Sequence, residues 1–170
     1  MMRIVLADLD DPRVIDLLRI HLDRARAETA PGSAHALDVA QLRSADISFW
    51  AIWDDETLLG LGALKRLSVD HGEVKSMHTA EAARGKGVAT TMLRHIMAAA
   101  RDRAMSRLSL ETGSWDYFRP ARAFYRKHGF TECAPFGDYV SDVNSVFMSI
   151  NLLKSRPADD RLRPDTGGAS

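Results

Sequence analysis

The stretch EVKSMHTAEAARGKGVAT, residues 73–90, is the part of the chain from which its fold and chemistry are best interpreted. Residues 73–79 have the character of a strand, and a short loop then leads into a long segment with helical spacing. Apolar side chains recur there every four residues, at Val88, Met92, Ile96, Ala100 and Ala104. The stretch therefore predicts a strand, a loop and the start of a long amphipathic helix.

The loop itself, Arg84-Gly85-Lys86-Gly87, has the composition of a phosphate site. The first turn of a helix leaves four N–H groups without partners, at the positive end of the helix dipole. Gly85 and Gly87 let an anion approach this backbone closely, and Arg84 and Lys86 add full positive charges. The pattern indicates a pyrophosphate site, although a glycine loop that merely turns the chain into a helix is the plainer alternative.

Two other phosphate-binding motifs do not fit these residues. A P-loop needs Gly-x-x-x-x-Gly-Lys-Ser/Thr, which is absent. A dinucleotide fingerprint needs a third glycine three residues after Gly87, where Thr90 stands. It also needs an acidic residue after a second strand, whereas Asp102 lies within the helical pattern. A nucleotide-binding α/β protein is therefore disfavoured.

The rest of the chain predicts one mixed domain. We expect strands at 3–9, 47–53, 58–67, 73–79, 107–111 and 145–152, and helices at 12–29, 88–104 and 120–128. Asp70-His71-Gly72 is predicted as a turn, and residues 33–45 are ambiguous between a short helix and a loop. The order β-α-β-β-β-α-β-α-β predicts an α/β fold with a mostly antiparallel sheet. Residues 1–153 form the domain, and the polar segment 154–170 is predicted to be a flexible tail.

Composition limits the classes of function. The chain has 170 residues, with 23 Lys and Arg against 23 Asp and Glu, so its formal net charge is zero. A zero balance disfavours nucleic acid as the main partner, because phosphate backbones require a basic excess. No Cys or His spacing resembles a metal site, and we see neither a signal peptide nor an apolar segment long enough for a membrane. We therefore expect a cytoplasmic protein without a metal.

Two motifs in sequence point to a family. Arg84-x-x-Gly87-x-Ala89 matches the Arg/Gln-x-x-Gly-x-Gly/Ala signature of the GNAT superfamily of N-acetyltransferases. About 35 residues later, ARAFYRKHGF, residues 121–130, is similar to its second signature, Ala-x-x-Phe/Leu-Tyr-x-Lys-x-Gly-Phe. The resemblance covers residues 3–150, and on both motifs the chain is identified as a member of the superfamily. It implies a splayed pair of parallel strands, 73–79 and 107–111, that form a V-shaped acyl-CoA cleft.

The resemblance also implies roles for individual residues. The pyrophosphate of acetyl-CoA would bind to residues of the first signature, which are Arg84, Gly85, Lys86, Gly87, Val88 and Ala89. The pantetheine arm would pair with the main chain of Met77, His78 and Thr79 like an added strand. Tyr125 matches the tyrosine that protonates the departing thiolate, and a neutral phenol can do so at pH 7. The alternative is that Tyr125, together with Phe124, only packs the last helix.

Several residues are candidates for the base that takes the proton of the attacking amine. The resemblance implies a carboxylate on the receiving strand, so Glu73 is our first candidate, directly or through water. Glu73 could equally be a solvated residue after a turn. His78 is a second candidate. Glu111 and Asp138 could instead bind a cationic acceptor, or serve as ordinary loop carboxylates.

The chain also departs from the family pattern. Phe118 stands where an Asn commonly helps to hold the cofactor, and the loop before the first signature lacks its frequent proline. Trp115, Tyr117 and Phe118 could line an aromatic acceptor pocket or cover the core. Cys133 has no base beside it in sequence, and we expect an inert buried thiol.

Together these features predict an acetyl-CoA-dependent N-acetyltransferase whose amine acceptor attacks the thioester directly, with oxyanion stabilisation by backbone N–H groups near Met77. The alternative is a non-catalytic module that senses acyl-CoA. The acceptor is a small-molecule or peptide amine that the sequence does not identify. Superfamily members often dimerise, so the resemblance is also compatible with a homodimer.

Overall fold

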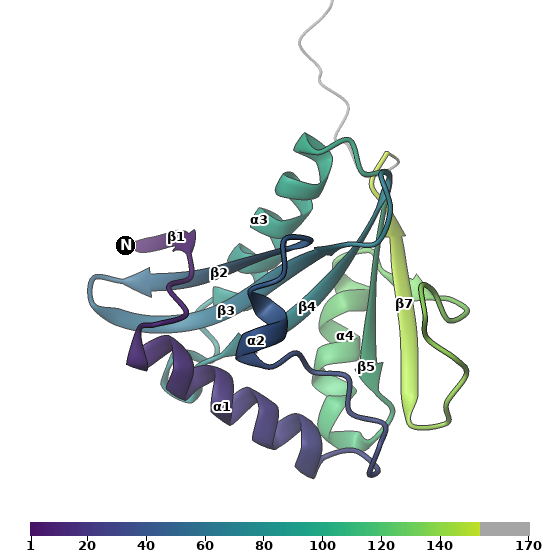
Figure 1. Ribbon diagram of the computed structural model, residues 1–170, viewed down its shortest axis with the longest axis horizontal. Coiled ribbons are helices and arrows are strands. Elements are labelled where there is room, and N and C mark those ends of the chain that lie inside the picture. Colours follow the sequence, from purple (N-terminus) through teal and green to yellow (C-terminus); the bar gives the residue numbers. More distant parts are fainter. Residues whose placement is uncertain (154–170) are drawn as a thin grey trace, which may run out of the picture.

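A seven-stranded sheet crosses the centre of the molecule in the order β1-β2-β3-β4-β5-β7-β6 (Figure 1). The fold is that of a computed structural model, which describes residues 1–153; the predicted tail, 154–170, lies outside them. The strands are β1 (Met2–Leu6), β2 (Ile47–Asp54), β3 (Thr57–Arg66), β4 (His71–Thr79), β5 (Arg107–Gly113), β6 (Thr131–Glu132) and β7 (Ser145–Asn151). Neighbouring strands are antiparallel except β4 and β5, which are parallel. The mixed, mostly antiparallel sheet is thereby confirmed.

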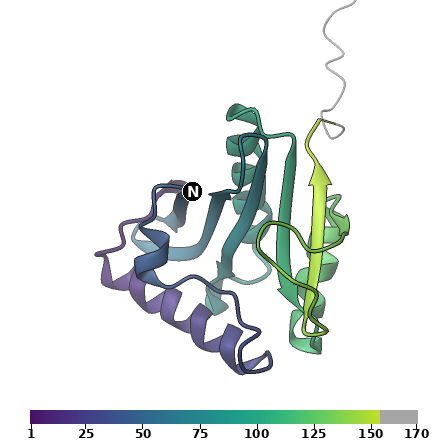
Figure 2. The same ribbon diagram turned by 45° about the vertical axis from the view of Figure 1, so that its right-hand side comes forward.

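Helices cover both faces of this sheet (Figures 1 and 2). They are α1 (Pro12–Ala27), α2 (Val39–Leu42), α3 (Val88–Asp102) and α4 (Arg119–Lys127), with single 3-10 turns η1 (Glu81–Ala83) and η2 (Asp116–Phe118). One face carries α1 and α2, and the other carries α3 and α4. As predicted, α1 begins with Pro after an Asp11 N-cap, whose side chain accepts a hydrogen bond from the Arg13 amide.

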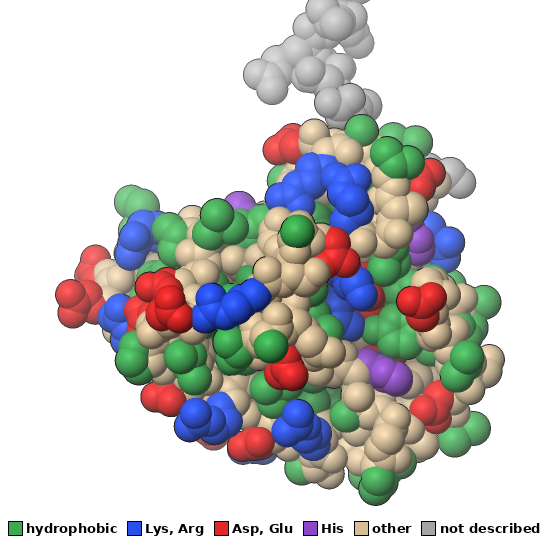
Figure 3. Space-filling model, viewed as in Figure 1, with side chains coloured by type: hydrophobic (Ala, Val, Ile, Leu, Met, Phe, Trp, Pro, Cys, Tyr) green, Lys and Arg blue, Asp and Glu red, His purple; other side chains and the backbone are tan. Residues whose placement is uncertain are grey.

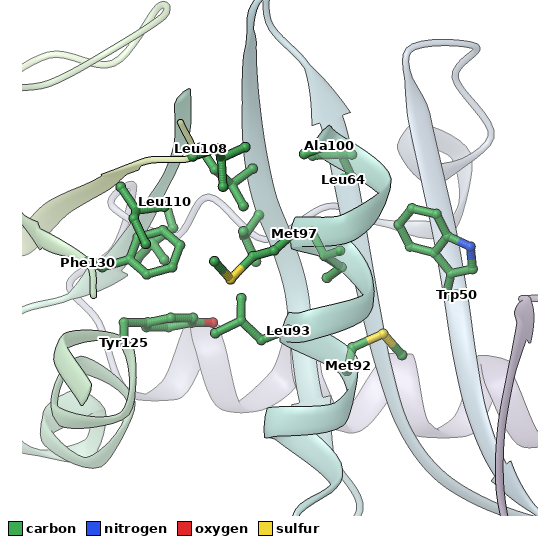
Figure 4. Packing of buried hydrophobic residues seen from close by; sticks show 14 of the residues in the cluster. Trp50, Leu64, Met92, Leu93, Met97, Ala100, Leu108, Leu110, Tyr125 and Phe130 are labelled. Atoms are coloured by element: carbon green, nitrogen blue, oxygen red, sulfur yellow. The ribbon is translucent and has the colours of Figure 1, made fainter. Parts of the chain in front are cut away.

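Each face of the sheet has its own apolar core. On one face, Val14, Leu17 and Leu18 of α1 pack on Phe49, Ala51, Trp53, Leu61 and Ala63. On the other, Val88, Met92, Ile96 and Ala100 of the predicted stripe pack on the sheet and on α4. Leu93, beside them, is fully buried (Figure 4), whereas Ala104 lies beyond the end of α3 and is exposed. Over the α1 and α2 face, acidic and basic side chains are interspersed (Figure 3).

Some local predictions differ from the structure, one ambiguous segment is resolved, and one strand was not predicted. β1 ends at Leu6 rather than at residue 9. His71 and Gly72 belong to β4, so the predicted turn is wrong there, because pairing with β3 and β5 extends the strand. The ambiguous segment contains α2, whose start is stabilised by a capping box between Asp38 and Gln41. The two-residue strand β6 was not predicted; it exists only through its pairing with β7.

The parallel pair β4 and β5 opens after three residues. Residues 71–73 register with 107–109, and no pairing follows, although β4 runs on to Thr79 and β5 to Gly113. The register of β4 against β3 also shifts near Ser76, which has a positive φ of 55°. Such a bulge bends the strand and increases its twist. The two strands therefore splay and leave backbone groups free on both edges, as predicted for the acyl-CoA cleft.

Gly60 of β3 sets how closely β3 can approach the end of β4. A Cβ atom at this position would lie 2.9 Å from the carbonyl oxygen of His78 and 2.9 Å from Cγ1 of Val88. Because the first of these is a backbone atom, the strand would have to move. We expect Gly60→Ala to lower the free energy of unfolding by about 1–3 kcal/mol, measured by urea denaturation at constant slope. An unchanged midpoint would contradict this.

Candidate active site

The loop between η1 and α3 forms a cradle of bare backbone. Gly85 and Gly87 have φ of 77° and 79°, which non-glycine residues rarely adopt, and no atom lies within 4 Å of a Cβ placed on either. Gly87 is the N-cap of α3 and provides no side-chain cap. Within residues 1–153 we find no protein acceptor for the amides of 85–90. These amides at the start of a fifteen-residue helix fit a pyrophosphate.

A large pocket of about 550 Å³ opens beside this cradle. Its volume is that of a typical site for a cofactor-sized ligand. It is lined by Met77, His78 and Thr79 of β4, by Arg84, Gly85, Gly87, Val88 and Ala89 of the first signature, and by residues of α1, η2 and α4. The structure thus brings together every residue predicted to hold acetyl-CoA except Lys86, which does not line it.

A smaller pocket of about 140 Å³ lies between the splayed strands. Its walls come from β4, β5, α1 and residues 33–36, and its polar lining includes Lys75, Ser76, Glu111 and Thr29. Residues lining both pockets are His21, Ala25, Met77, Phe118, Ala121 and Tyr125. The two pockets therefore meet, and Tyr125 stands at their junction.

Tyr125 is buried, with 7% of its surface exposed. Its ring packs edge-on against Phe124 and Phe130, and its hydroxyl points toward Leu93 on α3 (Figure 4). Burial raises the pKa of the phenol above its usual range. The group is therefore neutral throughout the physiological range and carries a proton that it could donate.

Glu73, the first candidate for the base, is held in a buried polar cluster. Its Oε2 accepts hydrogen bonds from the Tyr139 hydroxyl at 2.6 Å and from Lys75 Nζ at 3.2 Å. Lys75 Nζ also donates to the Tyr139 oxygen at 2.8 Å. Glu73 is 2% exposed and lines neither pocket. Its carboxylate is thus engaged by its own neighbours, and it positions Lys75 and Tyr139.

Glu111 is the carboxyl group that the structure does bring to the smaller pocket. It lies on β5 two residues beyond the last pairing with β4. Its pKa is raised to about 7, mainly by burial; the charges of Glu73 and Asp142 act in the same direction, while Ser145 and Lys75 act in the opposite direction. A carboxylate with a pKa near neutrality is suited to general-base catalysis.

His78, the second candidate for the base, makes a close contact with His21 of α1. Their Nδ1 atoms lie 3.3 Å apart, and the rings meet edge to face. Burial lowers the pKa of both rings to about 4, with nearby positive charge adding to the effect. Both are neutral near pH 7, so one Nδ1 donates to the other. A base this weak does not suit proton removal from an amine.

The remaining predicted residues are spread out. Asp138 is exposed and lines neither pocket. Phe118 lines both pockets and Tyr117 only the larger, whereas Trp115 lines neither and is 43% exposed. Cys133 is only half-buried, so the expectation of a buried thiol was wrong: it follows the edge strand β6, where one side stays open.

Several lining residues gave no signal in the sequence. Thr29 and Ser76 are single hydroxyls outside both signatures, and His21 lies inside the helix predicted at 12–29 with no motif around it. Tyr139 meets Glu73 across 66 residues of chain, so only the folded structure brings the two together. Only the alternation of Glu73 and Lys75 on one strand face could have indicated that they are neighbours.

Within the described part of the chain, no group of three or more His, Cys, Asp or Glu residues could hold a metal ion. Among the helices in residues 1–153, none is long and apolar enough to cross a bilayer.

The model of the acetyltransferase (GNAT) family matches residues 15–130. The chain belongs to this family. It is 46% identical over 151 residues to the uncharacterized N-acetyltransferase YsnE of Bacillus subtilis, covering 89% of this chain and all of that protein. It is 45% identical over 148 residues to the uncharacterized N-acetyltransferase YedL of Escherichia coli, covering 87% and 93%.

A solved structure has the same GNAT fold. PaiA N-acetyltransferase from Thermoplasma acidophilum, in complex with coenzyme A, superimposes with a TM-score of 0.69 at 17% identity, covering 89% of this chain and 99% of that one. With relatives of this kind and the family match, the chain is an acyltransferase of the GNAT family, as both signatures predicted.

Proposed function

We propose that this protein is an N-acetyltransferase that transfers the acetyl group of acetyl-CoA to a primary amine. The observation that carries the proposal is the junction of the two pockets at Tyr125: a long pocket that ends in the backbone cradle meets a small polar pocket between the splayed strands. A donor with a diphosphate and an extended arm fits the first, and an acceptor amine fits the second. The coenzyme A bound to the PaiA protein supports this assignment of the donor.

In the proposed mechanism the amine attacks the thioester carbonyl directly, forming the C–N bond as the C–S bond breaks. Glu111, which lines the smaller pocket, takes the proton of the amine, the role for which Glu73 is the first candidate from the sequence. Backbone N–H groups of β4 near Met77 stabilise the oxyanion. Tyr125 gives its proton to the leaving sulfur. Met77, His78 and Thr79 line the channel of the arm, and the diphosphate binds at Arg84, Gly85, Gly87, Val88 and Ala89.

The proposal is tested on the purified protein by binding and turnover. We expect coenzyme A to raise the melting temperature far more than pantetheine, which lacks the diphosphate and the nucleotide, because the cradle contributes most of the polar contacts. With acetyl-CoA and a panel of amines, free thiol should be released only when a suitable amine is present. Binding of coenzyme A without release by any amine would favour the alternative of a non-catalytic sensor.

A further inference from the structure

Two buried hydroxyls in the smaller pocket lack partners. Thr29 is 7% exposed and Ser76 is 8% exposed, and both line this pocket. Neither Oγ atom has a hydrogen-bond partner within residues 1–153. A buried hydroxyl without a partner is costly, so such groups call for an explanation. Ser76 also has a positive φ, and strained backbone of this kind clusters at ligand sites.

Lys75 places a positive charge beside these hydroxyls. Its side chain is only 8% exposed and lines the same pocket. An ammonium group has three N–H donors, and two of them bond to Glu73 and Tyr139. The third has no acceptor in the described part of the chain. The two buried hydroxyls without partners, in residues that line the pocket, and the remaining ammonium donor form a set that fits an anionic acceptor such as a carboxylate.

The opposite wall of the pocket has the opposite charge. Glu111 stands on β5, while Lys75 and Ser76 stand on β4, and the two strands diverge between them. A ligand in this space meets a carboxylate on one strand and an ammonium on the other. The space of about 140 Å³ is close to the engineered cavity of roughly 150 Å³ that accepts benzene, so the ligand is small.

We propose that the acceptor is a small amine that also carries a carboxylate, with an α-amino acid as the simplest member, and that Lys75, Ser76 and Thr29 bind this carboxylate. The inference rests on the proposed function and specifies its acceptor. The amine is directed to Glu111, and the carboxylate is held on the β4 side. A polyamine would instead bring a second ammonium toward Lys75, and a peptide amine would present a neutral amide there.

The experiment compares matched acceptors. Thiol release from acetyl-CoA is measured for the twenty amino acids, their decarboxylated amines and their amides, for example leucine, isoamylamine and leucinamide. We expect kcat/KM to be at least tenfold higher for the best amino acid than for its amine or amide. The amide is the sharper comparison because its less basic amine is deprotonated to a larger fraction near neutral pH, so the protonation of the amine works against a preference for the amino acid.

Two variants identify the residues that bind the carboxylate. Ser76→Ala and Thr29→Val should each raise KM for the amino acid about tenfold while leaving KM for the matched amine nearly unchanged. Because the hydroxyls lack partners in the protein, both variants should melt no lower than the wild type. Thr131→Val, on the exposed strand β6, is the matched control and should change neither constant.

The outcomes separate the inference from the function on which it rests. Equal turnover of amine, amide and amino acid, or variants with an unchanged KM for the amino acid, would overturn the carboxylate subsite and leave the acetyltransferase standing. If no thiol is released with any of these acceptors or with any other amine, although acetyl-CoA binds tightly, the proposed function is overturned and the proposed acceptor with it.

Discussion

Replacement of Glu111 by Gln should lower kcat/KM for the best acceptor by about 10²–10⁴-fold and remove the acidic limb of its pH profile near pH 7. General-base catalysis contributes a factor of this size. The carboxyl group has a pKa of about 7 and acts only when ionised, so wild-type activity should rise as the pH increases through 7. Gln keeps the shape of the side chain but cannot take the proton.

The charged and titratable groups around Glu111 come from several elements. Lys75 and Glu73 face it from β4, and Asp142 from the segment before β7, with Ser145 at the start of β7. Because the variant and the wild type use the same acceptor, the ionisation of the amine affects both profiles alike. The acidic limb that is lost from the pH profile of Glu111→Gln therefore reports the ionisation of Glu111.

Glu73→Gln is the matched control for this prediction. Glu73 lines neither pocket and bonds to Lys75 and Tyr139, so its replacement should lower stability more than activity and keep the limb near pH 7. Activity of Glu111→Gln within threefold of the wild type, or loss of the limb in Glu73→Gln alone, would return the base to Glu73.

The free energy of unfolding should depend on the same ionisation of Glu111. The pKa of Glu111 rises from 4.5 to about 7 on folding, so the folded state binds its proton more tightly than the unfolded state. The contribution of Glu111 to stability is therefore full below pH 4.5 and declines as the pH rises through 7, by up to ~3 kcal/mol for a shift of this size. Urea unfolding at several pH values should show this decline in the wild type and not in Glu111→Gln.

The parts of the site that are local in sequence could be predicted, because each is fixed by a few neighbouring residues. Gly85 and Gly87 need only the conformational freedom of glycine and the start of α3, whose stripe is visible in the spacing of its apolar residues. The splay of β4 and β5 followed from the family resemblance. Physical reasoning on the sequence alone gave neither its position nor its extent.

The smaller pocket could not be predicted, because it depends on contacts between distant segments. Glu73 is the first candidate for the base because it lies on β4. In the structure, however, its carboxylate accepts a hydrogen bond from Tyr139, 66 residues later in the chain. The pKa of Glu111 depends on burial beneath elements that sequence periodicity does not position. The strand β6, with two residues, lies below the length at which alternation carries any signal.

Replacement of Tyr125 by Phe should lower kcat about 10²-fold while the Kd for coenzyme A changes less than threefold. The ring of Phe retains the contacts with Phe124 and Phe130, so the fold should be preserved and the melting temperature nearly unchanged. What is lost is the hydroxyl proton of Tyr125, a residue that lines both pockets. Without it the sulfur must leave as a free thiolate in an apolar setting, which is unfavourable.

The pH profile and a control variant make this test specific. Burial raises the pKa of Tyr125 above that of a free phenol, so kcat of the wild type should stay level between pH 8 and about 10, where an ordinary phenol is already half ionised. Tyr117→Phe, at a residue that lines only the larger pocket, should keep full kcat. An equal loss in both variants would mean that tyrosine hydroxyls serve substrate binding. An unchanged kcat in Tyr125→Phe would mean that the thiolate departs without an acid, and that Tyr125 serves only to pack α4 against the cleft.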